Sequence, residues 1–114
     1  MYKKVVIILK RSDMIKDRKI FNNIIRKGKY KKNEYFCIYT IPNSTNNTKF
    51  GIAISKKYGK AVKRNEIKRK TRAIIDKNRI LFKNDLDYII MIRKSCENVD
   101  FKTLDESIVA LLKG

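Results

Sequence analysis

Residues 55–72 read SKKYGKAVKRNEIKRKTR; nine of these positions are Lys or Arg, and Glu66 is the only acidic one. The stretch predicts a helix from about Ala61 to Lys77, because Ile67 and Ile74 recur on one side at helical spacing, with Thr71 between them. That side can pack on a sheet. We therefore expect an amphipathic helix whose other sides are strongly basic.

The basic residues of this helix form rows rather than a scattered set. Arg64, Lys68 and Arg72 are four residues apart and fall in one row, with Asn65 and Arg69 in the row beside it. Like charges at this spacing destabilise a helix slightly, a cost that phosphate groups lying against the row would offset. Arg offers a planar fork that matches phosphate oxygens, and the helix N-terminus adds positive charge. The pattern indicates a phosphate-binding surface.

Three strands are expected outside this helix. Tyr35–Ile41 and Lys49–Ser55 are rich in β-forming residues, and the polar segment 42–48 between them predicts two antiparallel strands joined by a flexible hairpin loop. The nearly all-apolar run Tyr88–Arg93 predicts a strand that is buried on both faces.

Two further helices are predicted from their end signals and apolar stripes. The first runs from about Arg18 to Lys27, with Asp17 as N-cap and Gly28 as stop, and the other from about Lys102 to Lys113 with Asp100 as cap. A short helical turn is expected around residues 80–83. The apolar stripe of the helix at residues 18–27 consists of Ile20, Phe21, Ile24 and Ile25. That of the helix at residues 102–113 consists of Leu104, Ile108, Leu111 and Leu112. The order read from the residues is α-β-β-α-β-α, in a single domain of residues 1–114.

The composition points to a polyanionic partner. Lys and Arg number 29 against 11 acidic residues, a net charge of +18. A membrane partner is disfavoured, because the longest apolar run, Val5–Leu9, is far shorter than the roughly 20 residues that span a bilayer. It is also too short for a signal peptide, so we expect a cytoplasmic protein. Cys37 and Cys96 are isolated and there is no His, which favours reduced structural thiols over a metal site.

Residues 55–69 resemble the signature of the bacterial ribonuclease P protein component: an Arg-Asn-Arg triplet, a hydrophobic residue, Lys-Arg, and a further Arg three residues on. The matching residues are Arg64, Asn65, Ile67, Lys68, Arg69 and Arg72. Glu66 departs, standing where the second Arg of the triplet usually is; on the helix it points away from the row of Arg64. The resemblance continues in Phe21–Gly28 and Phe36–Tyr39 and runs from about Met14 to the C-terminus, leaving residues 1–13 outside.

The resemblance implies an α+β fold: an α-β sandwich with a central mixed sheet of about four strands and three helices, in the order α-β-β-β-α-β-α, with a left-handed βαβ crossover (ribosomal protein S5 domain 2-like). It also implies a subunit of ribonuclease P, one protein per catalytic RNA, that assists removal of the 5′ leader from precursor tRNA. The residues expected to bind the catalytic RNA are Lys56, Lys57, Lys60, Lys63, Arg64, Asn65, Lys68, Arg69 and Arg72.

The resemblance also implies that a cleft between the first helix and the sheet holds the single-stranded leader. Strand alternation places Tyr39 on one face of its strand and Gly51, Ala53 and Ser55 on one face of the next, which suggests a trough with a floor of small residues and aromatic walls. The residues expected to bind the leader are Phe21, Ile25, Tyr39, Ala53 and Ser55. The family often has an aromatic residue where Ile25 stands, so one stacking wall is expected to be missing.

The sequence predicts no catalytic residue, metal or cofactor bound by the protein alone. Without His, general acid–base catalysis is disfavoured, and neither Asp85 with Asp87 nor Asp105 with Glu106 suggests a two-metal site. Mg²⁺ is therefore expected to act through the catalytic RNA. Two alternatives remain at this point: a ribosomal or other structural RNA-binding protein without a role in tRNA maturation, and a stand-alone nuclease.

Overall fold

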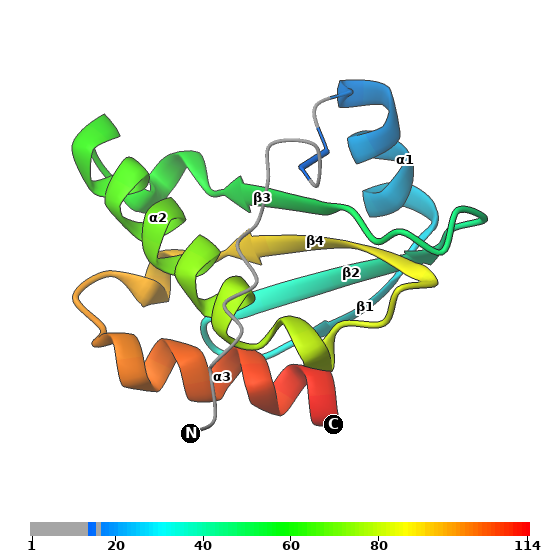
Figure 1. Ribbon diagram of the computed structural model, residues 1–114. Helices are drawn as coiled ribbons and strands as arrows, with labels where there is room; N and C mark the ends of the chain where they lie inside the picture. Colours follow the sequence, from blue (N-terminus) through cyan, green and yellow to red (C-terminus); the bar gives the residue numbers. More distant parts are fainter. Residues whose placement is uncertain (1–13, 16) are drawn as a thin grey trace, which may run out of the picture.

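The computed structural model describes residues 14–15 and 17–114. In this part of the chain, three α-helices and three short 3₁₀ turns accompany a four-stranded mixed sheet (Figure 1). In chain order the elements are α1 (Arg18–Lys27), β1 (Lys29–Lys32), β2 (Phe36–Pro42), β3 (Phe50–Ile54), η2 (Lys56–Tyr58), α2 (Ala61–Lys77), η3 (Arg79–Leu81), β4 (Leu86–Ile92), η4 (Lys94–Cys96) and α3 (Phe101–Lys113). The expected α+β class and the order α-β-β-β-α-β-α are confirmed.

The strand order is β1-β2-β4-β3, and it corrects the expected hairpin. β2 and β3 run in opposite directions but do not pair: β4 lies between them, antiparallel to β2 and parallel to β3. The apolar sequence of β4 explains this order, because such a strand is most stable with neighbours on both edges and cover on both faces. The hairpin that does form joins β1 to β2.

The connection from β3 through α2 to β4 joins two adjacent parallel strands. It has the left-handed sense that the resemblance implied, against the strong general preference for right-handed crossovers (Figure 1). None of the described helices is long and apolar enough to cross a membrane.

One face of the sheet forms the main core with α2 and α3. Strand side chains such as Phe36, Phe50 and Ile90 are completely buried there. The predicted inner side of α2 is confirmed, since Ile67, Thr71, Ile74 and Ile75 are all buried. Each large apolar side chain buried in this way contributes roughly 1.5–3 kcal/mol relative to exposure. This packing fixes α2 against the sheet, with its remaining sides turned to solvent.

The helix α1 lies on the opposite face of the sheet, separated from α2 and α3 by the strands (Figure 1). Its Phe21 ring lies over Gly51, where an added Cβ would be 2.8 Å from the Phe21 Cε2 atom. Gly28 ends α1 as expected, but with a φ of −72° rather than the left-handed conformation usual for a glycine stop. Glycine is needed because a Cβ there would approach the Ile24 and Thr40 carbonyl oxygens to 2.5 and 2.6 Å.

The helix ends agree with the capping signals in the sequence. Asp17 accepts a hydrogen bond from the Lys19 amide at 2.8 Å, and Asp100 accepts one from the Thr103 amide at 3.3 Å. The last helix begins one residue earlier than expected, at Phe101. The short turn expected at residues 80–83 is observed as η3.

Candidate nucleic-acid interface

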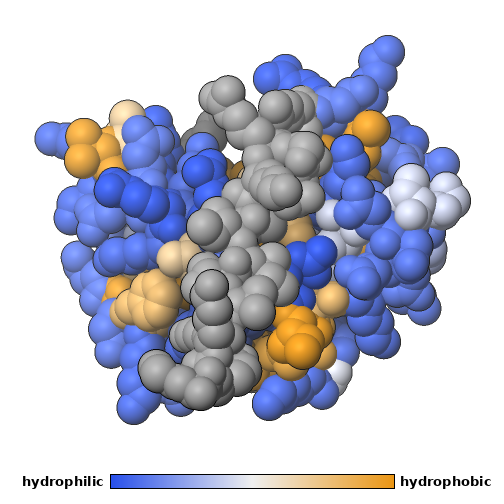
Figure 2. Space-filling model, viewed as in Figure 1, coloured by the Kyte–Doolittle hydropathy of each residue, from blue (hydrophilic) through white to orange (hydrophobic). Residues whose placement is uncertain are grey.

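The basic row predicted on α2 is present, because the helix is continuous from Ala61 to Lys77. Arg64 and Lys68 are half-buried and Arg72 is exposed, with Asn65 and Arg69 exposed in the next row. The side chain of Arg64 donates a hydrogen bond from Nη1 to the Gly59 carbonyl at 2.6 Å, which holds its guanidinium beside the loop that precedes the helix. Hydrophilic side chains cover most of the surface around α2, with a few apolar ones among them (Figure 2).

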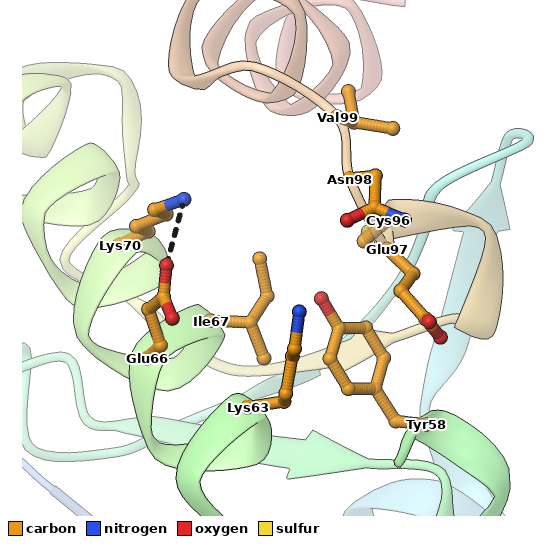
Figure 3. A pocket seen from close by; sticks show the side chains of 9 residues that line it. All are labelled: Tyr58, Lys63, Glu66, Ile67, Lys70, Cys96, Glu97, Asn98 and Val99. Carbon is orange, nitrogen blue, oxygen red and sulfur yellow. Dashed lines mark ion pairs between the residues drawn. The ribbon is translucent and has the colours of Figure 1, made fainter. Parts of the chain in front are cut away.

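Glu66 lies on the other flank of α2, as its place on the helix predicted. Its carboxylate pairs with Lys70 Nζ at 3.4 Å (Figure 3). The two residues border a hollow of about 70 Å³ between α2 and residues 96–99, into which Lys63 and Tyr58 also point. Lys63, expected to bind RNA together with the row, therefore lies on the flank of Glu66 instead. The residue that departs from the family pattern leaves the row of Arg64, Lys68 and Arg72 intact.

The loop before α2 is ordered by its own hydrogen bonds. Ser55 Oγ accepts a hydrogen bond from the Lys57 amide at 3.2 Å, which starts the turn η2. Gly59 follows with a φ of 136°, a conformation that side-chain-bearing residues rarely adopt. Lys60 is the N-cap residue of α2, and its side chain makes no capping hydrogen bond. Lys57 and Lys60 are exposed, whereas the side chain of Lys56 lies outside what the structure describes.

Two of the expected leader-binding residues lie on one face of the sheet, and a third reaches over it from α1. The register places Tyr39 opposite Ile89 and Ala53 opposite Met91, while Phe21 lies over Gly51. Because the sequence predicts β2 and β3 as direct neighbours, the expected residues do not include Ile89 and Met91, which lie on this face of β4 between the two strands. The nearly all-apolar sequence of β4 shows no polar alternation that would mark the face of Ile89 or Met91.

The two remaining residues expected to bind the leader have different positions. Ile25 is half-buried on α1, so no aromatic ring stands there. Ser55 lies beyond the end of β3, and its hydroxyl oxygen is used as the cap of η2. We use the name sheet-face trough for the residues gathered on this face, of which Gly51 and Ile89 are buried: Phe21, Tyr39, Gly51, Ala53, Ile89 and Met91.

Tyr39 has the electrostatic properties of a neutral stacking residue. Burial, followed by the neighbouring Cys37 thiol, raises the pKa of the Tyr39 phenol. The ring therefore stays uncharged at neutral pH and offers its face without repelling phosphate. Burial likewise raises the pKa of the Cys96 thiol to about 11, so it stays protonated, and both cysteines are free.

Two of the four carboxylates considered as metal ligands, Asp87 and Asp105, have structural partners. Asp87 Oδ1 accepts hydrogen bonds from Asn43 Nδ2 and the Lys49 amide, both at 3.0 Å. Asp105 pairs with Lys77 and accepts a hydrogen bond from Asn78 at 2.7 Å. Among residues 14–15 and 17–114, no three His, Cys, Asp or Glu side chains are grouped to hold a metal ion. Whether metal ions act only through the RNA stays a prediction.

The comparison with known proteins decides the family. A family model described as Ribonuclease P matches residues 9–114. The chain belongs to the ribonuclease P protein family. The match begins upstream of Met14, where the recognisable resemblance in the sequence was expected to start.

Individual relatives agree with this family. The chain is 31% identical, over 105 residues, to the ribonuclease P protein component of Streptococcus pneumoniae (strain Hungary19A-6), covering 92% of this chain and 85% of the relative. The solved ribonuclease P protein from Thermotoga maritima is 34% identical with a TM-score of 0.80, covering 88% of this chain and 94% of that one. A ribonuclease P protein mutant of Staphylococcus aureus, described as defective in mRNA degradation activity, is 30% identical with a TM-score of 0.83, covering 90% and 87%.

Family membership establishes the general role. The chain is the protein component of a ribonucleoprotein endonuclease that processes tRNA, and its partner is the ribonuclease P RNA. The alternative of a structural RNA-binding protein without a role in tRNA maturation is not favoured.

Proposed function

We propose that the α2 row, formed by Arg64, Lys68 and Arg72, binds the catalytic RNA while the sheet-face trough binds the 5′ leader of precursor tRNA. The protein thereby assists endonucleolytic removal of the leader. The observation on which this rests is that the cationic row of α2 and the aromatic rings of the sheet-face trough lie on different parts of one fold. The ordered loop of residues 55–60 joins them, because it leads from the end of β3 into the start of α2.

The α2 row supports binding to structured RNA through phosphates. Arg64, Lys68 and Arg72 repel one another at helical spacing, and neither ion pair described above, Lys70 with Glu66 or Lys77 with Asp105, uses a residue of this row. Phosphate groups would remove this repulsion and accept hydrogen bonds from the guanidinium groups. Each neutralised phosphate also releases condensed counterions, which makes such binding favourable and dependent on salt.

The sheet-face trough supports binding to unpaired nucleotides. Single-stranded RNA exposes base faces that stack on aromatic rings, with roughly 1–3 kcal/mol lost per base when the ring is removed. Phe21 and Tyr39 provide two such rings at different places on the sheet, with Ile89 between their positions. The Phe21 ring covers Gly51, whereas the small side chain of Ala53 is only half-buried on β3 and supports a place for a ligand there.

The chemistry of cleavage belongs, in this proposal, to the catalytic RNA and its Mg²⁺ ions. The sequence contains no His, and the carboxylates of Asp87 and Asp105 have structural partners. The role of the protein is to neutralise phosphate charge and to position the leader. One protein per RNA and a cytoplasmic location complete the proposal.

Reconstitution tests it. A bacterial ribonuclease P catalytic RNA with this protein should process precursor tRNA at Mg²⁺ concentrations too low for the RNA alone. The benefit of the protein should be greater for a precursor with a leader than for one whose leader is a single nucleotide. Equal benefit for both substrates would refute leader binding, and cleavage by the protein without RNA would refute the assignment of the chemistry.

A further inference from the structure

Tyr30 is an aromatic side chain on the edge strand β1 that has no place in the core. It is 60% exposed, whereas Tyr39 is half-buried and the remaining aromatic residues of the sheet, Phe36, Phe50 and Tyr88, are buried. The register of the β1–β2 hairpin places Tyr30 directly opposite Tyr39, so both rings project from the face that α1 partly covers. Their ring centroids are 5.7 Å apart and their planes are inclined by 40°.

The two tyrosines extend the sheet-face trough to the edge of the sheet. Phe21 lies over β3, Tyr39 is on β2 and Tyr30 is on β1, with β4 between β3 and β2. At about 4.8 Å between neighbouring strands, this set of rings spans roughly 14 Å across the sheet. That width exceeds what one base covers, and the outermost ring is the most accessible of the three.

The surroundings of Tyr30 are strongly basic. Residues 26–33 contain five basic residues and no acidic one. Lys32 projects from the same face of β1 as Tyr30, and Arg26 and Lys27 form the exposed last turn of α1 just before the strand. Lys31 projects from the other face, where its ammonium group binds the Gly114 carbonyl. An exposed aromatic ring among cations complements an unpaired base and its phosphates.

We propose that Tyr30 forms a further stacking subsite for an unpaired base of the precursor tRNA leader, beyond the base that stacks at Tyr39. This inference rests on the proposed leader-binding role of the sheet-face trough. It also gives a function to an aromatic residue that the fold leaves in solvent. In this arrangement Tyr30 on β1 supplies a second aromatic ring next to Tyr39. On α1, by contrast, position 25 holds the aliphatic side chain of Ile25.

The test measures dissociation constants of precursor tRNA for the holoenzyme assembled with a bacterial ribonuclease P catalytic RNA. Tyr30→Ala should weaken binding of a substrate with a long unpaired leader by about fivefold to tenfold, the lower part of the range for a stacked base. Tyr30→Phe keeps the ring and should retain nearly full affinity. Phe101→Ala is the control, because Phe101 is a partly exposed ring on α3, on the other side of the sheet. It should leave the affinity unchanged.

Leaders shortened one nucleotide at a time locate the contact. The penalties of Tyr30→Ala and Tyr39→Ala should vanish at different leader lengths, because the two rings stack on different nucleotides. A Tyr30→Trp variant adds a direct readout, since the chain contains no other tryptophan. Its fluorescence should be quenched by substrate with the long leader and not by leaderless tRNA.

The outcomes separate this inference from the role of the trough. An unchanged affinity in Tyr30→Ala, with a loss in Tyr39→Ala, would refute the subsite and leave the trough in place. No effect of either variant would refute the trough itself. An equal loss for leaderless substrate would show that Tyr30 acts independently of the leader and would also refute the proposal. A purely structural cross-strand pair would lower the melting temperature of Tyr30→Ala without changing leader-dependent affinity.

Discussion

Replacing Lys68 with Ala removes the central cation of the α2 row, and its effect on RNA binding can be worked out from the structure. If Lys68 neutralises one phosphate, the slope of log affinity against log salt should shrink by about 0.7–0.9. A change of about 0.8 means that a fourfold rise in salt weakens the wild-type complex about threefold more than the variant complex.

The folded protein should not suffer from this substitution. Lys68 repels both Arg64 and Arg72 across one helical turn, and each like-charge pair costs roughly 0.2–0.5 kcal/mol. Ala also has the highest helix propensity. The variant should therefore unfold at the same temperature as the wild type or slightly above it, and any loss of RNA affinity is a loss of contact.

Lys70→Ala is the matched control. It removes the same charge from the same helix two residues away, but Lys70 pairs with Glu66 on the other flank. The assay is filter binding or fluorescence anisotropy of the catalytic RNA over a salt series. The magnitude of the slope of log affinity against log salt should decrease in Lys68→Ala and stay close to the wild-type value in Lys70→Ala. Equal slopes in all three proteins, or equal reductions in the two variants, would refute the α2 row as a specific contact surface.

Three further predictions concern the trough and the stability of the fold. Gly51→Ala places a Cβ 2.8 Å from the Phe21 ring, so it should displace the ring, cost about 1–3 kcal/mol in chemical unfolding and weaken only leader-dependent binding; unchanged leader affinity would contradict this. Partial burial opposes ionisation of Asp105, but hydrogen bonds from Lys77 and Asn78 and the Lys77 charge lower the pKa of its carboxyl. Because the folded-state pKa is lowered, the stabilisation is present above the unfolded value of about 3.9 and is lost as pH falls through the folded value. Asp105→Asn should thus lose about 1–2 kcal/mol near neutral pH, a small figure because Lys77 is largely exposed, and the difference from wild type should shrink in acid; a difference that is constant with pH would contradict the ion pair. Sulfate should stabilise the free protein by roughly 1.4 kcal/mol at about ten times its dissociation constant, and by less in Lys68→Ala; a melting temperature that does not respond to sulfate would argue against clustered phosphate sites.

The helices could be predicted from the sequence because their signals are local. Asp17 and Asp100 stand at the caps, and the bounds of α1 and α2 agree with the expected ranges. The α2 row also depends only on helical spacing, so its geometry followed directly from the positions of Arg64, Lys68 and Arg72.

The sheet was less predictable because strand order depends on contacts between distant segments. β1 was missed when the residues were read alone, since its sequence KYKK is exposed throughout and shows no apolar alternation. The place of β4 between β2 and β3 depends on its need for cover on both sides, which no turn signal records. As a result, Ile89 and Met91 were absent from the expected trough, and the pairing of Tyr30 with Tyr39 could not be seen.

The separation of two polynucleotide-binding surfaces is tested most directly by measuring two affinities for each of two variants. One is the affinity of the protein for the catalytic RNA, and the other is the gain in substrate affinity that a leader gives the holoenzyme. Lys68→Ala should lower the first and leave the second unchanged, whereas Tyr39→Ala should do the reverse. If each variant lowers both quantities to a similar extent, the α2 row and the sheet-face trough are not separate sites, and the account is wrong.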